Sequence, residues 1–250
     1  MIKTVPWPAL LGLLLALTSL NGASDLSSVI KYLETGFEIS ILKKPERGTL
    51  KLARFNNRVK SITLRKEGQE IPQELTPFPS HWEIKLSGMR DFRGSTVFVE
   101  TVGPPQLAGK VMIIEPTSSG TLALHAHLAI PVGKEIRYKP QIDQNAIGFW
   151  RNMDDYLEWH FQPSKTGKYR VIIHQSCGAK LGGSLAEFRI GEEILKYKVK
   201  DTGDFNTFEA RRAGILKIES TDPHTLQLHI TRLAKYAAMD VRLIELVPLD

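Results

Sequence analysis

Two alternating runs of apolar and polar residues in the second half of the chain constrain its fold more than any other feature. In LEWHF at 157–161 every second residue is apolar, and YRVIIH at 169–174 repeats the alternation after a break at 163–167. A period of two places successive side chains on opposite faces of a β-strand. The pattern therefore predicts an antiparallel sheet with one solvent-exposed face, and it places Trp159 in the core.

The first half of the chain also consists mainly of strand patterns separated by Gly, Pro or Asn. They are GTLKLARF at 48–55, RVKSITLRKEGQEI at 58–71, HWEIKLSG at 81–88 and STVFVETV at 95–102. In the third of them, Trp82, Ile84 and Leu86 share one face. SSVIKYLETGF at 27–37 instead predicts a short helix with Val29 and Ile30 on one side.

The N-terminal 23 residues predict a secretory signal, with Lys3 before the apolar run ALLGLLLAL and small residues at Gly22 and Ala23. We therefore expect a secreted protein, extracellular or periplasmic, without a membrane span. The rest of the 250 residues exceed one sandwich of about 100 residues, which predicts two domains. Gly- and Pro-rich segments place the boundary near residue 118, giving domains at 24–118 and 119–250.

The 33 basic and 27 acidic residues are spread over both halves, so no polyanion-binding tail stands out and we expect no nucleic-acid partner. Lys196, Lys198 and Lys200 share one face of a predicted strand. This face is interpreted as a solvated sheet edge that discourages aggregation, and the alternative is a patch for an anionic glycan or nucleic acid. Cys177 is the only cysteine, which excludes an intramolecular disulfide and favours a buried, unreactive thiol.

A search for catalytic residues yields no complete set. Asp154 and Asp155 are adjacent, which suits a turn-capping pair better than the two carboxylates that glycoside hydrolysis uses. His174 and Cys177 would lie on opposite strand faces and could not form a dyad. The H-x-H pattern of His125 and the histidine at 127 predicts two solvent-facing strand histidines, because a zinc site needs further ligands.

Four segments of the second half carry a family resemblance. IGFW precedes DYLEW, a P-x-x-x-G-x-Y turn follows at 163–169, and HTLQLHI and MDVRLIEL close the chain. The region from about residue 120 to 250 resembles family 6-like carbohydrate-binding modules, especially those appended to secreted fucosidases and sulfatases. The resemblance implies a galactose-binding-like jelly roll that binds a glycan.

The resemblance also implies the site residues. The family's loop site has an aromatic in a G-[YF]-x segment, an aromatic after a T-G-x turn and an Asn before the last strand. These positions correspond to Phe149 or Trp150, to Phe205 and to Asp240. Trp150 is either ligand-facing or a lid on the sandwich edge. Asp240 departs from Asn because it accepts but does not donate hydrogen bonds, and Asn206 could supply the lost amide.

The same family often holds a structural Ca²⁺ between an E-A-E pattern and an Asp of the last strand. The corresponding residues here are His125, His127 and Arg242. Ca²⁺ requires anionic or carbonyl oxygens, whereas two imidazoles and a guanidinium would repel it. We therefore predict no metal at this place, and the sequence indicates no other cofactor.

The first half resembles the C-terminal β-sandwich of family 29 α-L-fucosidases. The matching segments are PERGTLKL at 45–52, VKSITL at 59–64, WEIKL at 82–86 and TVFVETV at 96–102. In those enzymes the sandwich follows a catalytic (β/α)8 barrel of about 250 residues. Only about 16 residues separate the predicted signal from the first strand here, so we expect neither the barrel nor glycosidase activity.

These observations predict an all-β protein of two β-sandwich domains that is secreted, lacks catalysis and binds a glycan through loop aromatics. Two alternatives stay open. The chain could be a detached accessory tail of an α-L-fucosidase or sulfatase that acts with a separate catalytic chain, in association with that glycoside hydrolase. It could also be a structural or adhesion protein, which a large apolar surface patch would favour.

Overall fold

The computed structural model describes residues 15–16, 28–108 and 111–249. The predicted signal at 1–23 lies outside the described residues except for Leu15–Ala16. Two compact units form. Unit 1 comprises Met1–Lys51, Val59–Thr76 and Glu83–Gln106, and unit 2 comprises Leu52–Arg58, Pro77–Trp82 and Leu107–Asp250. The last passage of the chain from unit 1 to unit 2 follows Gln106. The domain boundary near residue 118 stays a prediction.

The described residues are organised as strands and two short 3-10 helices, η1 (Glu46–Gly48) and η2 (Ala126–Leu128). None of the helices in the described ranges is long and apolar enough to cross a membrane.

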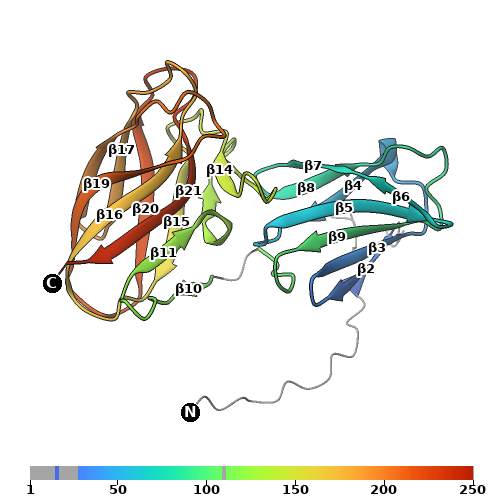
Figure 1. The fold of residues 1–250 in the computed structure, drawn as a ribbon, viewed down its shortest axis with the longest axis horizontal. Coiled ribbons are helices and arrows are strands. Elements are labelled where there is room, and N and C mark those ends of the chain that lie inside the picture. Colours follow the sequence, from blue (N-terminus) through green and yellow to red (C-terminus); the bar gives the residue numbers. More distant parts are fainter. Residues whose placement is uncertain (1–14, 17–27, 109–110, 250) are drawn as a thin grey trace, which may run out of the picture. The chain divides into compact units, whose positions relative to one another are not determined.

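The first part of the chain forms two sheets, of which the larger is antiparallel (Figure 1). A six-stranded sheet has the order β1 (Leu15–Ala16), β2 (Ser28–Leu33), β3 (Gly36–Ile41), β9 (Thr96–Thr101), β5 (Val59–Lys66) and β6 (Gln69–Pro72). A three-stranded sheet has the order β4 (Thr49–Ala53), β8 (His81–Lys85) and β7 (Glu74–Pro77). The strands predicted from residue 48 onward are confirmed, and Trp82, Ile84 and Leu86 are all buried as expected.

The helix predicted at 27–37 is wrong, because this segment forms the β2–β3 hairpin. Its residues pair in register from Ser28 opposite Ile41 to Leu33 opposite Gly36. The pairing buries Ile30, which is 4% exposed, and β-branched residues suit such a pleated surface. Contacts with β3 therefore override the local helical spacing.

Gly36 is required where β3 begins. Its φ is +148°, and a Cβ placed there would lie 2.1 Å from the carbonyl oxygen of Val99 in the neighbouring strand β9. Only a residue without a side chain allows the two backbones to approach this closely.

Gly36→Ala should therefore destabilise the protein more than Gly68→Ala. Gly68 has a φ of +78° but faces open space, so its replacement costs only the left-handed strain of about 1–2 kcal/mol. At Gly36 the clash with the β9 backbone adds to that cost. Urea denaturation followed by circular dichroism measures both variants, and equal losses would contradict the role given to the close approach.

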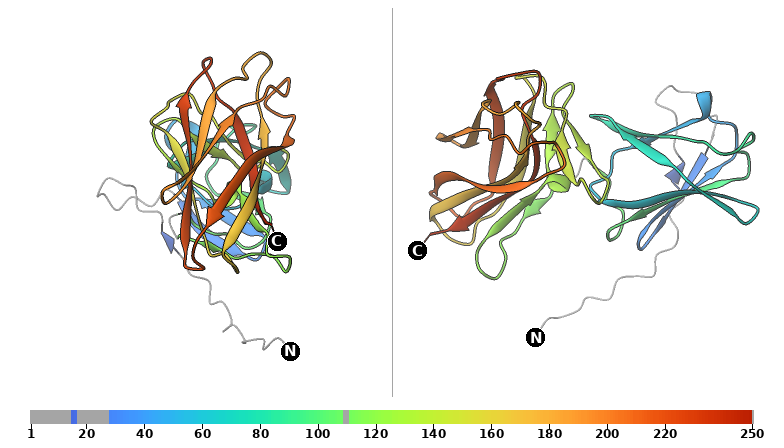
Figure 2. Two further views of the ribbon diagram at one scale, coloured as in Figure 1. Left: turned by 90° about the vertical axis from the view of Figure 1, so that its left-hand side faces the viewer. Right: turned by 45° about the horizontal axis from the view of Figure 1, so that its top comes forward.

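Unit 2 contains two six-stranded sheets (Figure 1, Figure 2). One has the order β10 (Ile113–Ile114), β15 (Tyr156–Phe161), β20 (His224–Arg232), β17 (Leu185–Ile190) and β18 (Glu193–Lys198), with β12 (Ile130–Val132) also paired to β15. The other has the order β13 (Arg137–Lys139), β14 (Ala146–Gly148), β21 (Asp240–Pro248), β16 (Gly167–Ser176) and β19 (Glu209–Ile218), with β11 (Leu122–His125) paired to β21.

The chain crosses repeatedly from one of these sheets to the other. It passes from β15 to β16, from β16 to β17, from β18 to β19, and again through β20 to β21. Alternation of this kind is the jelly-roll form of a β-sandwich. The predicted all-β class, with a jelly roll in the second part of the chain, is confirmed.

The two alternating runs that predicted this architecture supply the apolar layer of unit 2. Trp159 is fully buried, and its ring nitrogen donates to the carbonyl of His125 at 2.9 Å. The other inward side chains of the two runs are equally buried, namely Leu157, Phe161, Tyr169, Val171 and Ile173.

The lysine-bearing strand lies at a sheet edge, as β18 has no hydrogen-bonded partner beyond β17 in its sheet. Lys196, Lys198 and Lys200 are exposed, whereas Tyr197 and Val199 between them are buried. The alternation predicted for these residues is confirmed, and charged side chains at this edge oppose pairing with another chain.

Candidate functional site

A pocket of about 300 Å³ opens at one end of the unit 2 sandwich. Three loops and the ends of two strands supply it: the segment after β14, the segment between β18 and β19, the segment between β20 and β21, the last residue of β13 and the first residue of β21. Its lining consists of Lys139, Phe149, Trp150, Arg151, Phe205, Tyr236, Ala237, Met239 and Asp240. Aromatic rings and a few charged groups thus converge on one concave surface, which is typical of a small-ligand site.

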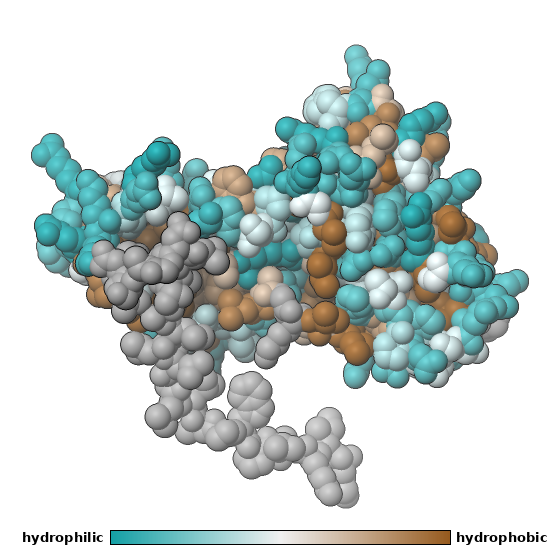
Figure 3. Space-filling view, turned by 180° about the vertical axis from the view of Figure 1, so that it is seen from behind, coloured by the Kyte–Doolittle hydropathy of each residue, from teal (hydrophilic) through white to brown (hydrophobic). Residues whose placement is uncertain are grey.

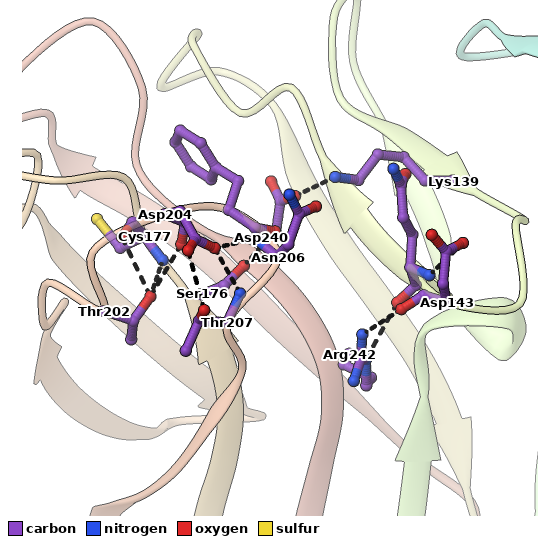
Figure 4. Close-up of polar contacts among 12 residues, drawn as sticks. Lys139, Asp143, Ser176, Cys177, Thr202, Asp204, Asn206, Thr207, Asp240 and Arg242 are labelled. Carbon is purple, nitrogen blue, oxygen red and sulfur yellow. Dashed lines mark hydrogen bonds and ion pairs between the residues drawn. The ribbon is translucent and has the colours of Figure 1, made fainter.

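An ion pair between Lys139 and Asp240 is the most buried polar feature of this pocket (Figure 4). Their side chains are 12% and 5% exposed, respectively. Burial raises the pKa of Asp240 above its ordinary value, and the charge and hydrogen bond of Lys139 oppose that shift. Gly148 leaves space for this carboxylate, because a Cβ there would lie 2.4 Å from Asp240 Oδ1.

The pair can offer both hydrogen-bonding roles to a ligand. The carboxylate of Asp240 accepts, and the ammonium of Lys139 carries three donors, of which Asp240 engages at least one. The donor that Asp240 lacks relative to an amide is therefore available from the neighbouring lysine. The sequence pattern does not reveal this, because the two residues are 101 positions apart.

The aromatic residues of the pocket differ in accessibility. Tyr236 is 65% exposed, whereas Phe149 and Phe205 are half-buried. Phe205 packs against Gly178, where a Cβ would lie 2.8 Å from its ring. Phe149 adopts a φ of +60°, unusual for a non-glycine residue, and the guanidinium of Arg137 lies 4.0 Å from the centre of its ring.

Side-chain hydrogen bonds within the loop hold Phe205 in place (Figure 4). The carboxylate of Asp204 accepts the backbone N–H groups of Asn206 and Thr207, both at 2.6 Å. These bonds lower the pKa of Asp204. The hydroxyl of Ser176, at the end of β16, donates to the carbonyl of Phe205 at 2.9 Å. The loop is therefore ordered before any ligand binds.

Four of the five residues assigned from the resemblance line this one pocket: Phe149, Trp150, Phe205 and Asp240. Asn206 is exposed and follows Phe205 in the loop, but it is not part of the lining. Their role in binding stays a prediction, while their gathering around one pocket is a property of the fold.

Of the two alternatives given for Trp150, the structure favours the lid on the sandwich edge. The tryptophan side chain is 1% exposed, and Nε1 donates to the carbonyl of Asp155 at 3.0 Å. A ring so enclosed closes the sandwich edge, which was the alternative reading of this residue, and cannot offer a free face to a sugar.

Five pocket residues were missed in the sequence, namely Ala237, Met239 and the three that carry a polar group: Lys139, Arg151 and Tyr236. Tyr236 had a detectable signal, since it is a large aromatic in the short loop before the last strand. Lys139 had none, because its importance depends entirely on its partner across the fold. Arg151 directly follows Trp150 and was missed because only the aromatic residues of this segment match the family's site.

The acidic pair at 154–155 stabilises a loop, as expected. Asp155 is 1% exposed and accepts the backbone N–H groups of Lys134, Glu135 and Ile136, each at 2.9 Å. Asp154 is exposed. Three donors already occupy the carboxylate of Asp155, so it is unsuited to general acid or base chemistry.

The predicted inertness of Cys177 agrees with its surroundings. The thiol is fully buried, its Sγ donates to the carbonyl of Ala238, and burial raises its pKa to about 11. His174 instead lies 2.8 Å from the carboxylate of Glu245. No thiolate–imidazole dyad forms between these two residues.

The histidines of the H-x-H pattern do not share a strand face, and this expectation is wrong. His125 ends β11, whereas His127 lies in η2, and their rings stack with centres 5.3 Å apart. Both are half-buried rather than facing solvent. Arg242 is engaged elsewhere, donating to the carbonyls of Asp143 and Gln144. Within the described ranges, no three His, Cys, Asp or Glu side chains gather as metal ligands.

Lys139→Met should lower the free energy of unfolding by about 3–5 kcal/mol, because it leaves the carboxylate of Asp240 buried and unpaired. The matched control is Lys217→Met, which breaks an exposed pair with Glu219 and should leave the unfolding midpoint nearly unchanged. Urea titration measures both. A loss no larger for Lys139→Met than for the control would show that the buried pair does not matter.

Stability should also fall on acidification because His127 is held neutral. Burial, followed by the charges of His125 and Arg58, lowers the pKa of His127 from 6.5 to about 4. Between those values the unfolded chain binds a proton that the folded chain does not, so stability present above pH 6.5 is lost toward pH 4.

Between pH 7 and pH 4 the native protein should lose about 2 kcal/mol more of its free energy of unfolding than His127→Phe, which lacks the imidazole. Free energies of unfolding at several pH values, for both proteins, provide the measurement. Parallel pH profiles for the two proteins would refute the assignment.

No protein-family model matches the sequence, and no curated protein matches it either. Solved structures do match. An α-L-fucosidase from Vibrio sp. strain EJY3 aligns at 13% identity and a TM-score of 0.37, covering 88% of this chain and 39% of that one. The C-terminal family 6 carbohydrate-binding module of a laminarinase from Zobellia galactanivorans aligns at 14% identity and a TM-score of 0.41, covering 51% of this chain and 99% of that one.

A family 35 carbohydrate-binding module from Clostridium thermocellum aligns at 12% identity and a TM-score of 0.43, covering 52% of this chain and 98% of that one. Structural neighbours of this chain thus include carbohydrate-binding modules. The chain spans 39% of the length of the fucosidase. All of these TM-scores are below 0.5, so the likenesses carry no argument about the site or its activity.

Proposed function

We propose that unit 2 binds a carbohydrate in the pocket that Tyr236, Phe205 and the ion pair of Lys139 and Asp240 line. The single observation that carries the proposal is the convergence of an exposed aromatic ring and a buried donor–acceptor pair on one concave surface. A pyranose has the matching chemistry, with an apolar C–H face for the ring and hydroxyl groups for the charged pair.

The roles of the residues follow from their positions. Tyr236, the most exposed ring, stacks on the sugar face. Phe205 also lines the pocket and contributes less area because part of its ring packs on Gly178. Lys139 and Asp240 orient the ligand through its hydroxyl groups. Because both charges are desolvated, a well-placed hydroxyl increases affinity, whereas a missing one leaves a charged group without a hydrogen-bond partner.

The proposal is for binding without turnover. The pocket lining contains one carboxylate, Asp240, and glycoside hydrolysis ordinarily uses two. Asp240 is also paired with Lys139 and enclosed, so it is poorly placed to attack a sugar or to activate water. Cooperation with a separate glycoside hydrolase remains an extension of this proposal.

Tyr236→Ala should weaken glycan binding about tenfold, because it removes the accessible stacking surface. Tyr236→Phe is the matched control and should retain most of the affinity, since it preserves the ring. Glycan-array screening followed by affinity electrophoresis with the positive polysaccharides provides the measurement. Equal binding by the native protein and Tyr236→Ala would remove the pocket as the site.

A structural or adhesion role is the second candidate, and one observation favours it. Leu107, Val111, Met112 and Ile113 are between 38% and 60% exposed and belong to one stretch of unit 2. On the face shown in Figure 3, hydrophobic residues form separate patches among hydrophilic ones. Absence of binding to every glycan tested would favour this role over the first.

A further inference from the structure

The positive charges that line the pocket exceed the negative ones. Lys139 and Asp240 neutralise each other as a buried ion pair. Arg151, the other charged residue of the lining, is exposed. Among the carboxylates of the described chain, none forms an ion pair with it. One guanidinium charge is therefore left without an acidic partner in a surface that otherwise suits a sugar.

A second arginine strengthens this positive field. The guanidinium groups of Arg137 and Arg151 lie 4.0 and 6.0 Å from the centre of the Phe149 ring. Burial, followed by the charge of Arg151, lowers the pKa of Arg137, and Glu135 opposes the shift. The two cations are thus close enough to repel each other, and an anion near them would relieve that repulsion.

The acidic residues of the neighbouring loop do not balance these charges, because they bind their own backbone. Asp204 accepts the N–H groups of Asn206 and Thr207, and Asp201 accepts that of Gly203 at 2.8 Å. These carboxylates act as turn caps. Backbone N–H groups of the loop and of Lys180 therefore engage these carboxylates.

We propose that the pocket selects glycans that carry an anionic substituent, either a uronate carboxylate or a sulfate ester, and that Arg151 binds that substituent. The inference rests on the proposed function and adds the class of sugar to it. A guanidinium presents paired N–H donors in a planar fork that matches both oxyanions. Tyr236 would hold the sugar ring while Arg151 engages the charge.

The test compares three sets of probes on the full chain: neutral laminari- and cello-oligosaccharides, oligogalacturonates, and sulfated galactan oligosaccharides. The acidic probes should bind more tightly than the neutral ones at 50 mM NaCl and lose most of that advantage at 500 mM, because salt screens exposed charges. Whether oligogalacturonates or sulfated probes respond identifies the source of the anion.

Arg151→Gln should weaken binding of the responding acidic probe about tenfold or more and leave the neutral probes unchanged. Arg151→Lys keeps the charge without the fork and should lose part of the affinity. The matched control is Arg212→Gln, which removes an exposed arginine of β19 outside the pocket lining and should bind like the native protein. This control separates a local contact from a change of net charge.

Equal affinity for neutral and acidic probes, or equal losses in Arg151→Gln and Arg212→Gln, would overturn the selection of anionic sugars. Either result would leave carbohydrate binding itself intact, because the response of the neutral probes to Tyr236→Ala decides that. Failure of every probe to bind would overturn both proposals together.

Discussion

The structure depends on apolar side chains buried between facing sheets, since the one cysteine allows no intramolecular disulfide and the described residues contain no layer of helices. In unit 2, the inward side chains of β15 and β16 are almost completely buried. Burial of a large apolar side chain contributes about 1.5–3 kcal/mol relative to its exposure, so this layer outweighs any surface contact. A layer of this kind also fixes the strand register, because a slip of one residue would turn every inward side chain to water.

With the sheets fixed in this way, the loops at the sandwich end are ordered by polar side chains that bind backbone N–H groups. Asp155 holds the segment before β13, and Asp204 holds the loop that carries Phe205. Both aspartates could be mistaken for catalytic groups in the sequence. Their donors show instead that they position other residues, which is how a pocket built on loops can keep a defined shape.

The ion pair of Lys139 and Asp240 differs from these two aspartates. Burying its two charges opposes folding, so its use lies in a binding site. Removing two charges from water carries a penalty that their mutual attraction offsets only when the geometry is good. A pair of apolar residues would stabilise the sandwich edge at least as well. The presence of the ion pair in the same pocket as the exposed ring of Tyr236 is what the proposed recognition of a polar ligand rests on.

The strands were predictable where alternation was strict, as at 157–161, because the period of the side chains reports directly which face is buried. The segment at 27–37 was misjudged because Val29 and Ile30 also fit one side of a helix, and the deciding partner, β3, lies beyond the reach of local periodicity. The two alternatives for Trp150 stayed open for a related reason. A tryptophan in a loop can face water or the core, and the carbonyl of Asp155 that receives its N–H determines which.

Patterns along the chain predicted the all-β class, the inward residues of most strands and the buried state of Cys177, and the family resemblance pointed to four of the residues that line the pocket. Each of these is encoded by a local pattern, or by a motif whose spacing survives in the fold. The contact of Lys139 with Asp240, the exposure of Tyr236 and the lack of an acidic partner for Arg151 among the described residues became visible only in the folded chain. Those facts depend on distances between residues far apart in the chain, and no local spacing specifies them.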